Sequence, residues 1–130
     1  MQQVLVVAGA LFLMVHGLIH LMGTVAYLKL GRIENLPYKT TLLGGSWDIG
    51  DRGMRLFGAL WVLPAVGFVL GGLALLAGWP WWQPLLTAVA VVSLTLTVLD
   101  WSSAWAGAVL NVVVLAVVLI GPTVRSAFKR

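Results

Sequence analysis

The chain has 130 residues, of which 61% are hydrophobic and only 9% are charged. Because a soluble domain carries roughly 25% charged residues, this composition excludes a water-soluble globular protein and indicates one domain within a lipid bilayer. The net charge of +4 comes from basic residues in a loop and a tail, which indicates contacts with lipid headgroups rather than with nucleic acid. The absence of cysteine excludes disulfides and thiolate metal ligands.

Four apolar segments follow one another along the chain, and the longer ones reach the roughly 20 residues that a helix needs to cross a bilayer. They cover residues 4–28, 54–77, 84–99 and 104–120. Glycine and proline separate the second segment from the third, and residues 100–103 join the third to the fourth as a tight hairpin. We therefore predict an all-α, antiparallel, integral membrane four-helix bundle with one long loop between the first and second helices.

The first apolar segment follows no basic residue and is longer than the core of a usual signal peptide, so we expect a retained membrane span. It holds His16 and His20, the only two histidines of the chain. Four residues make about one helical turn, so both imidazoles should leave the same face of the helix. Ionisable side chains at membrane depth indicate a functional site.

The loop of residues 29–53 carries most of the charged side chains. Asp48 precedes Arg52 by one helical turn, and Asp51 precedes Arg55 in the same way, which predicts a short helical lead-in to the second span. This loop has more basic residues than the tail, but the basic tail follows its helix directly. We predict a bacterial cytoplasmic membrane as the location, with both termini in the cytoplasm.

Polar residues gather in the half of the predicted membrane nearest the long loop. At 1.5 Å per residue, His20 lies about 12 Å from the end of the first segment, and Asn111 lies about 10 Å from the start of the fourth. In both the first and the fourth helix, small residues lie on the same face as these polar side chains. We therefore expect the two helices to touch with the polar side chains between them. The predicted ligand-binding residues are His16, His20, Asn111, Asp100, Arg55 and Tyr27. Asp100 and Arg55 are expected at the mouth of the site, and Tyr27 is expected on the same face of the first helix as the two histidines.

Two neutral imidazoles one turn apart can share a metal ion, so His16 and His20 are also candidate metal ligands. Gly17 stands where a zinc protease of the His-Glu-x-x-His type has glutamate, which argues against that class. Two histidines on one helical face cannot straddle a haem. A haem would need a single histidine ligand here, or a second one from another copy of the chain.

Three further roles for these polar residues remain open. An apolar ligand with a carbonyl group, such as a quinone, could be held by an imidazole N–H and the Asn111 amide. The same groups could only lock helices together in a structural or accessory subunit of a membrane complex. They could also relay protons in a small transporter or channel, which four short helices would form as a homo-oligomer.

The first-helix stretch of residues 11–23 resembles that of a group of small, uncharacterised, four-helix bacterial membrane proteins, which share a core of His-Gly-Leu-Ile-His-Leu. Residues 55–61 look like the start of their second helix, and residues 101–111 are similar to their Trp…Gly…Asn approach to the fourth. This resemblance implies their architecture and no established activity. DoxX-like proteins are similar in size and helix count, and some of them are linked to membrane redox complexes.

Overall fold

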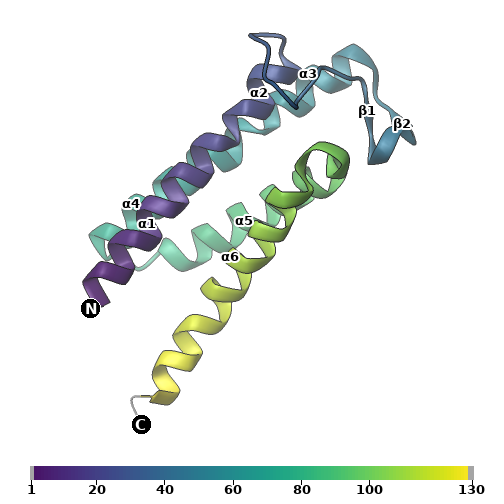
Figure 1. Ribbon diagram of the computed structural model, residues 1–130. Helices are drawn as coiled ribbons and strands as arrows, with labels where there is room; N and C mark the ends of the chain where they lie inside the picture. The colour runs from purple at the N-terminus through teal and green to yellow at the C-terminus, as the bar shows by residue number, and fades with distance from the viewer. Residues whose placement is uncertain (1, 129–130) are drawn as a thin grey trace.

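The computed structural model describes the backbone of residues 2–128 and the side chains of residues 3–121. Its helices form four long apolar stretches, each long enough to cross a membrane (Figure 1). This confirms the prediction of an all-helical chain with four long apolar helices. In chain order the helices are α1 (Gln2–Ile19) with α2 (Leu21–Tyr27), α3 (Gly50–Leu60) with α4 (Val62–Ala77), α5 (Trp82–Leu99) and α6 (Trp101–Phe128).

Two of the four stretches are interrupted at a single residue, His20 between α1 and α2 and Trp61 between α3 and α4, and α6 is kinked at the non-helical residue Ala104 near its start. His20 Nδ1–H donates a hydrogen bond to the His16 carbonyl oxygen at 2.7 Å. The His20 backbone N–H therefore donates to the Gly17 carbonyl oxygen instead, at 3.0 Å. Pro64 has no N–H to donate to the preceding turn, which weakens the helix beside Trp61. The two interrupting residues are neighbours, with ring centroids 5.5 Å apart.

Helix packing follows chain order, because α1 packs along α4, α4 along α5, and α5 along α6. Glycine permits close approaches between these helices: a Cβ added at Gly17 would lie 2.8 Å from the Ala65 carbonyl oxygen of α4. Within the described residues, α1 and α6 form no extensive backbone contact, so their small residues do not pack them closely together. The two helices do meet at the expected polar side chains, because His16 of α1 bonds Asn111 of α6. An added Cβ would meet nothing within 4 Å at Gly9, and at Gly107 it would meet Thr97 of α5. Gly107 therefore faces α5, whereas Gly9 faces open space.

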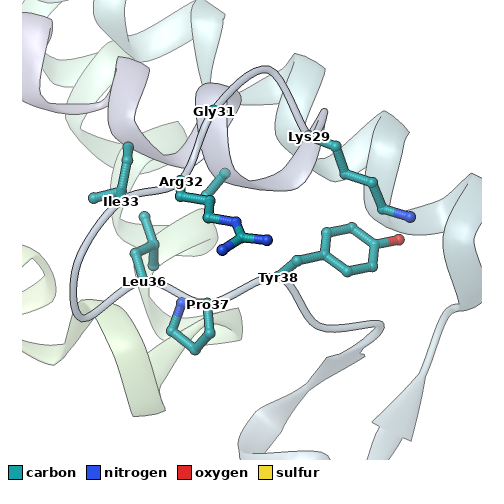
Figure 2. A pocket seen from close by; sticks show the side chains of 8 residues that line it. Lys29, Gly31, Arg32, Ile33, Leu36, Pro37 and Tyr38 are labelled. Carbon is teal, nitrogen blue, oxygen red and sulfur yellow. The ribbon is translucent and has the colours of Figure 1, made fainter.

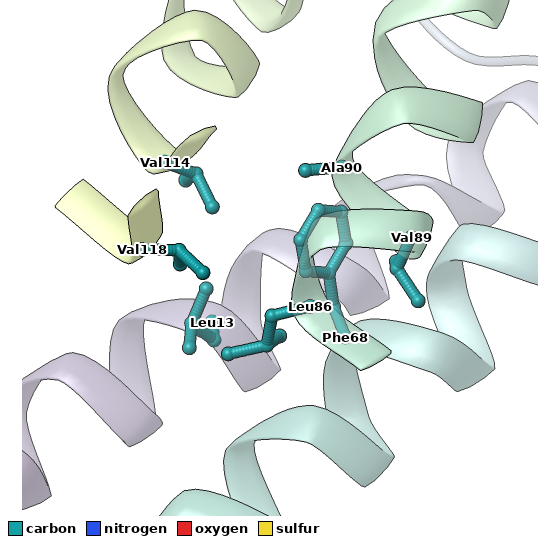
Figure 3. Packing of buried hydrophobic residues seen from close by; sticks show 7 residues of the cluster. All are labelled: Leu13, Phe68, Leu86, Val89, Ala90, Val114 and Val118. Carbon is teal, nitrogen blue, oxygen red and sulfur yellow. The ribbon is translucent and has the colours of Figure 1, made fainter. Parts of the chain in front are cut away.

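Two groups of buried apolar side chains hold the helices together. One joins α1, α4, α5 and α6 (Figure 3), and consists of Leu13, Phe68, Leu86, Val89, Ala90, Val114 and Val118. The other lies near the long loop and consists of Ala26, Tyr27, Leu42, Met54, Phe57, Trp61 and Leu96. The second group includes residues of α2, α3, α5 and the loop, so it fixes the loop to the helices.

The long loop between α2 and α3 is folded. Strand β1 (Thr41–Leu42) pairs antiparallel with β2 (Trp47–Asp48), and a single 3-10 turn, η1 (Leu43–Gly45), joins them. Gly44 and Gly45 have φ angles of 66° and 93°, a left-handed conformation that glycine adopts at little cost. Leu42 is only 2% exposed and anchors this hairpin in the second apolar group.

The helical lead-in expected before the second long stretch corresponds to α3, which has Asp51 in its first turn. The ion pairs expected inside it do not form among the described residues. Asp48 instead accepts a hydrogen bond from the Gly50 N–H at 3.0 Å. Asp51 lies 3.9 Å from the Lys29 ammonium, so it ties α3 to the end of the first stretch.

We expect Gly17→Ala to lower the free energy of unfolding by about 1–3 kcal/mol, because the added methyl group would force α1 away from α4. Gly9→Ala is the matched control on the same helix, and it should leave stability unchanged or slightly higher, since its methyl group meets nothing. Titration with SDS, followed by tryptophan fluorescence, measures both. Equal stability of the two variants would contradict the close packing at Gly17.

Candidate functional site

A closed circuit of hydrogen bonds links the first stretch to α5 and α6. The His16 Nε2–H donates to Asn111 Oδ1 at 3.0 Å, and Asn111 Nδ2 donates to Ser93 Oγ at 2.7 Å. The Ser93 hydroxyl donates to His20 Nε2 at 2.5 Å, and His20 Nδ1–H donates to the His16 carbonyl at 2.7 Å. All four side chains are buried. We call these four residues the polar circuit.

The partners determine the proton positions in the polar circuit. A carbonyl oxygen can only accept, so His20 carries its proton on Nδ1 and accepts at Nε2. The Asn111 amide oxygen likewise requires the proton of His16 to lie on Nε2. Every hydrogen bond of the circuit is therefore satisfied with both imidazoles neutral, and no bound ion is needed to complete it.

The polar circuit fits a metal ion or a haem poorly. A metal ligand must offer a nitrogen lone pair, and both His20 nitrogens already have partners. His16 Nε2 is engaged by Asn111, which leaves only His16 Nδ1. Among the described residues, no group of three or more histidine or acidic side chains could hold a metal ion. A metal would have to break the circuit before the two histidines could bind it.

Asn111 was expected to lie at the depth of His20. It instead forms its hydrogen bond with His16, which lies one helical turn deeper. α6 begins at Trp101, but Ala104 has non-helical angles (φ −126°, ψ 19°) and kinks its first turn. Counted through this kink at 1.5 Å per residue, Asn111 lies about 15 Å into α6, close to the depth of about 17 Å for His16 counted from Tyr27. Ser93 of α5 then bridges the remaining turn to His20.

A second polar group surrounds Asp100, which is 1% exposed at the turn between α5 and α6. The Tyr27 hydroxyl donates to this carboxylate, and the Lys39 ammonium lies 2.5 Å from it. Lys39 also donates to Ser103 at 2.9 Å and to Ser102 at 3.2 Å. A lysine from the long loop therefore neutralises a carboxylate buried among the helices.

A cavity of about 260 Å³, which we call the loop-side cavity, lies between the two polar groups and has mostly apolar walls. His16 and His20 line it together with Trp61 and Asp100, and Leu36 of the long loop borders it. The indole N–H of Trp61 is buried and has no acceptor among the described residues. Its indole packs against Gly23, where an added Cβ would lie 2.7 Å from the ring. A buried donor without a partner costs about 1–3 kcal/mol, so an acceptor is expected here.

The structure brings five of the six predicted site residues into the two polar groups: His16, His20 and Asn111 into one, and Tyr27 and Asp100 into the other. Arg55 stands apart. Its side chain is exposed and does not line the loop-side cavity, so it does not occupy the expected position at the mouth.

Sequence reasoning missed Ser93, Lys39 and Trp61 as site residues. In the sequence, Ser93 indicates only that the third predicted helix is somewhat polar. Lys39 lies in a loop whose residues show no helical or strand periodicity. Trp61 is surrounded by apolar residues in the sequence. The one available signal was Pro64, which marks a weak point in the helix one turn after Trp61.

A third feature is an open pocket of about 530 Å³ on the long loop (Figure 2). Lys29 and Arg32 line it, and the Lys29 ammonium lies 4.3 Å from the centroid of the Tyr38 ring. The Tyr38 hydroxyl donates to the Asp51 carboxylate, and this hydrogen bond raises the pKa of Tyr38 above its ordinary value. Among the described residues that line this pocket, no buried side-chain donor or acceptor lacks a partner, unlike Trp61 in the loop-side cavity.

No family model, no curated protein and no solved structure matches this chain. The resemblance of the first-helix motif to small bacterial membrane proteins therefore stays a prediction. Function has to be inferred from the geometry of the site itself.

We expect Lys39→Met to lower the free energy of unfolding by about 3 kcal/mol, because it leaves a buried carboxylate without its counter-charge. Lys29→Met is the matched control. It removes an ion pair whose side chains are 54% and 65% exposed, and exposed pairs contribute little. SDS titration measures both variants. Adding Asp100→Asn to Lys39→Met should recover part of the loss, and no recovery would contradict the charge argument.

Proposed function

We propose that this chain is an integral membrane four-helix bundle that binds a small, neutral, apolar molecule with a hydrogen-bond acceptor. The loop-side cavity would hold this ligand beside the polar circuit. Two observations carry the proposal: Trp61 lines a largely apolar cavity, and its buried indole N–H has no acceptor among the described residues.

Membrane insertion is supported by the exposed faces of the helices. Large apolar side chains on α6, such as Val109, Val113 and Val117, are 50–65% exposed, which suits lipid contact better than water. Exposed tryptophans lie near the two ends of the helices, as expected at membrane interfaces. They are Trp79 and Trp81 at one end, and Trp47, Trp101 and Trp105 at the other. A bacterial cytoplasmic membrane with cytoplasmic termini is part of the proposal.

The lining chemistry favours a neutral ligand. No lysine or arginine in the described part of the chain lines the loop-side cavity, so an anion would have no counter-charge there. Asp100 lines it but is already neutralised by Lys39, so a cation gains little. A ring ketone or quinone fits these constraints, because its carbonyl oxygen could accept from the Trp61 N–H while its ring packs against apolar walls. The imidazole N–H groups and the Asn111 amide, expected to hold such a ligand, are already used by the polar circuit.

The polar circuit itself supports a second role. Its four members satisfy one another, as helix-locking contacts do in membrane proteins. The histidines would then position the helices around the cavity, and the chain could act as a homo-oligomer or as an accessory subunit of a membrane complex. A proton relay is less favoured, because the His20 Nδ1 proton is held by a backbone carbonyl.

The test is binding of 2,3-dimethoxy-5-methyl-1,4-benzoquinone, a tailless quinone, to the protein in lipid nanodiscs by isothermal titration calorimetry. Trp61→Phe keeps an aromatic ring and loses the N–H, so binding should weaken about threefold to tenfold. Ala106→Phe places a ring at the edge of the cavity and should abolish binding.

Val112→Phe is the matched control for the cavity block, since Val112 is exposed on the same helix and does not line the cavity. It should bind the quinone like the wild type. Failure of the wild-type protein to bind, or equal binding by Ala106→Phe and Val112→Phe, would sink the proposal.

A further inference from the structure

A second cavity, of about 310 Å³, lies between α1 and α6 on the side of the chain termini. We call it the terminal cavity. Its floor contains Leu13, Leu86, Val114 and Val118 of the first apolar group (Figure 3). Gly9 and Val117 also line it, and no ionisable side chain among residues 3–121 does so.

The two cavities succeed each other along the same pair of helices. The loop-side cavity uses residues 16–23 of the first stretch and residues 103–110 of α6, whereas the terminal cavity uses residues 5–13 and 113–118. Phe12 of the terminal cavity stacks on His16 of the loop-side cavity, with ring centroids 5.8 Å apart and an interplanar angle of 5°. One helical turn therefore separates them.

This pair of cavities has a structural cause. α1 packs along α4, and α6 packs along α5, so α1 and α6 face each other without close packing of their own. Gly9 leaves open space on α1, since an added Cβ there would meet nothing within 4 Å. We call the space between α1 and α6 the seam. Polar side chains line it beside the polar circuit, and apolar side chains line it in the terminal cavity.

We infer that the ligand is an amphiphile: a carbonyl-bearing head occupies the loop-side cavity, and a long apolar tail lies in the terminal cavity. This inference rests on the proposed function. Neither cavity alone is large beside ligand sites of roughly 300–1,000 Å³, whereas head and tail together would use both. The exposed side chains Leu5, Val113 and Val117 border the terminal cavity, so a tail could enter it sideways from the bilayer.

In a bilayer the tail gains no hydrophobic free energy, because lipid tails are as apolar as the groove. The tail is held by dispersion contacts with the groove walls, which require a close fit. Filling the groove with a side chain should therefore weaken binding of the tailed ligand alone, and it should leave a tailless head unaffected.

The experiment compares two probes in lipid nanodiscs: the tailless benzoquinone and the same headgroup with a ten-carbon tail. Gly9→Leu adds a side chain to the wall of the terminal cavity, at a position where an added Cβ meets nothing within 4 Å. It should bind the tailless probe like the wild type and the tailed probe about tenfold more weakly, as expected if about five tail atoms lose their contacts. Val112→Leu, on the exposed face of α6, should change neither affinity. Partition of the tailed probe into lipid is the same for all variants and cancels in the comparison.

The outcomes separate the two proposals. If the wild type binds both probes and Gly9→Leu changes neither affinity, the tail inference is overturned while the proposed function stands. If Gly9→Leu instead alters only the oligomeric state by light scattering, the groove receives a second copy of the chain, and the tail inference is again overturned. If the wild type binds neither probe, the proposed function itself fails.

Discussion

The hydrogen bonds of the polar circuit are the constraint on which the rest of the structure depends. α1 and α6 do not pack closely, yet His16 and Asn111 join them through a bond of 3.0 Å, and Ser93 connects the same network to α5. In apolar surroundings a polar group without a partner is costly. Each of these side chains therefore holds the others at one depth and orientation. The circuit sets the width of the seam between α1 and α6.

The same interaction shapes the backbone. The hydrogen bond from His20 Nδ1 to the His16 carbonyl oxygen interrupts the regular helix at His20, and Pro64 weakens the neighbouring stretch beside Trp61. The two interruptions lie side by side. His20 and Trp61 both line the loop-side cavity, so this cavity lies beside the two interruptions. Catalytic and binding sites are often built where regular structure is interrupted.

The Asp100 group performs a different task at the loop end of the helices. A buried carboxylate requires a counter-charge, and the chain supplies it from Lys39, twelve residues after the end of α2. This ion pair holds the long loop over the loop-side cavity, with Leu36 on its border. The loop thus covers one end of the seam, and the exposed side chains Val113 and Val117 border the terminal cavity along α6.

The sequence by itself determined the features that depend on local geometry: four long apolar helices, a shared face for His16 and His20, and similar depths for the histidines and Asn111. These follow from composition and from 3.6 residues per turn. Only the tertiary structure decided which helices are neighbours, because this depends on how Gly17 and similar residues admit a particular partner. It also decided that Ser93 completes the circuit, that Lys39 meets Asp100, that Arg55 stays outside, and that Trp61 keeps an unpaired N–H. Such pairings join residues far apart in the chain, and no local period encodes them.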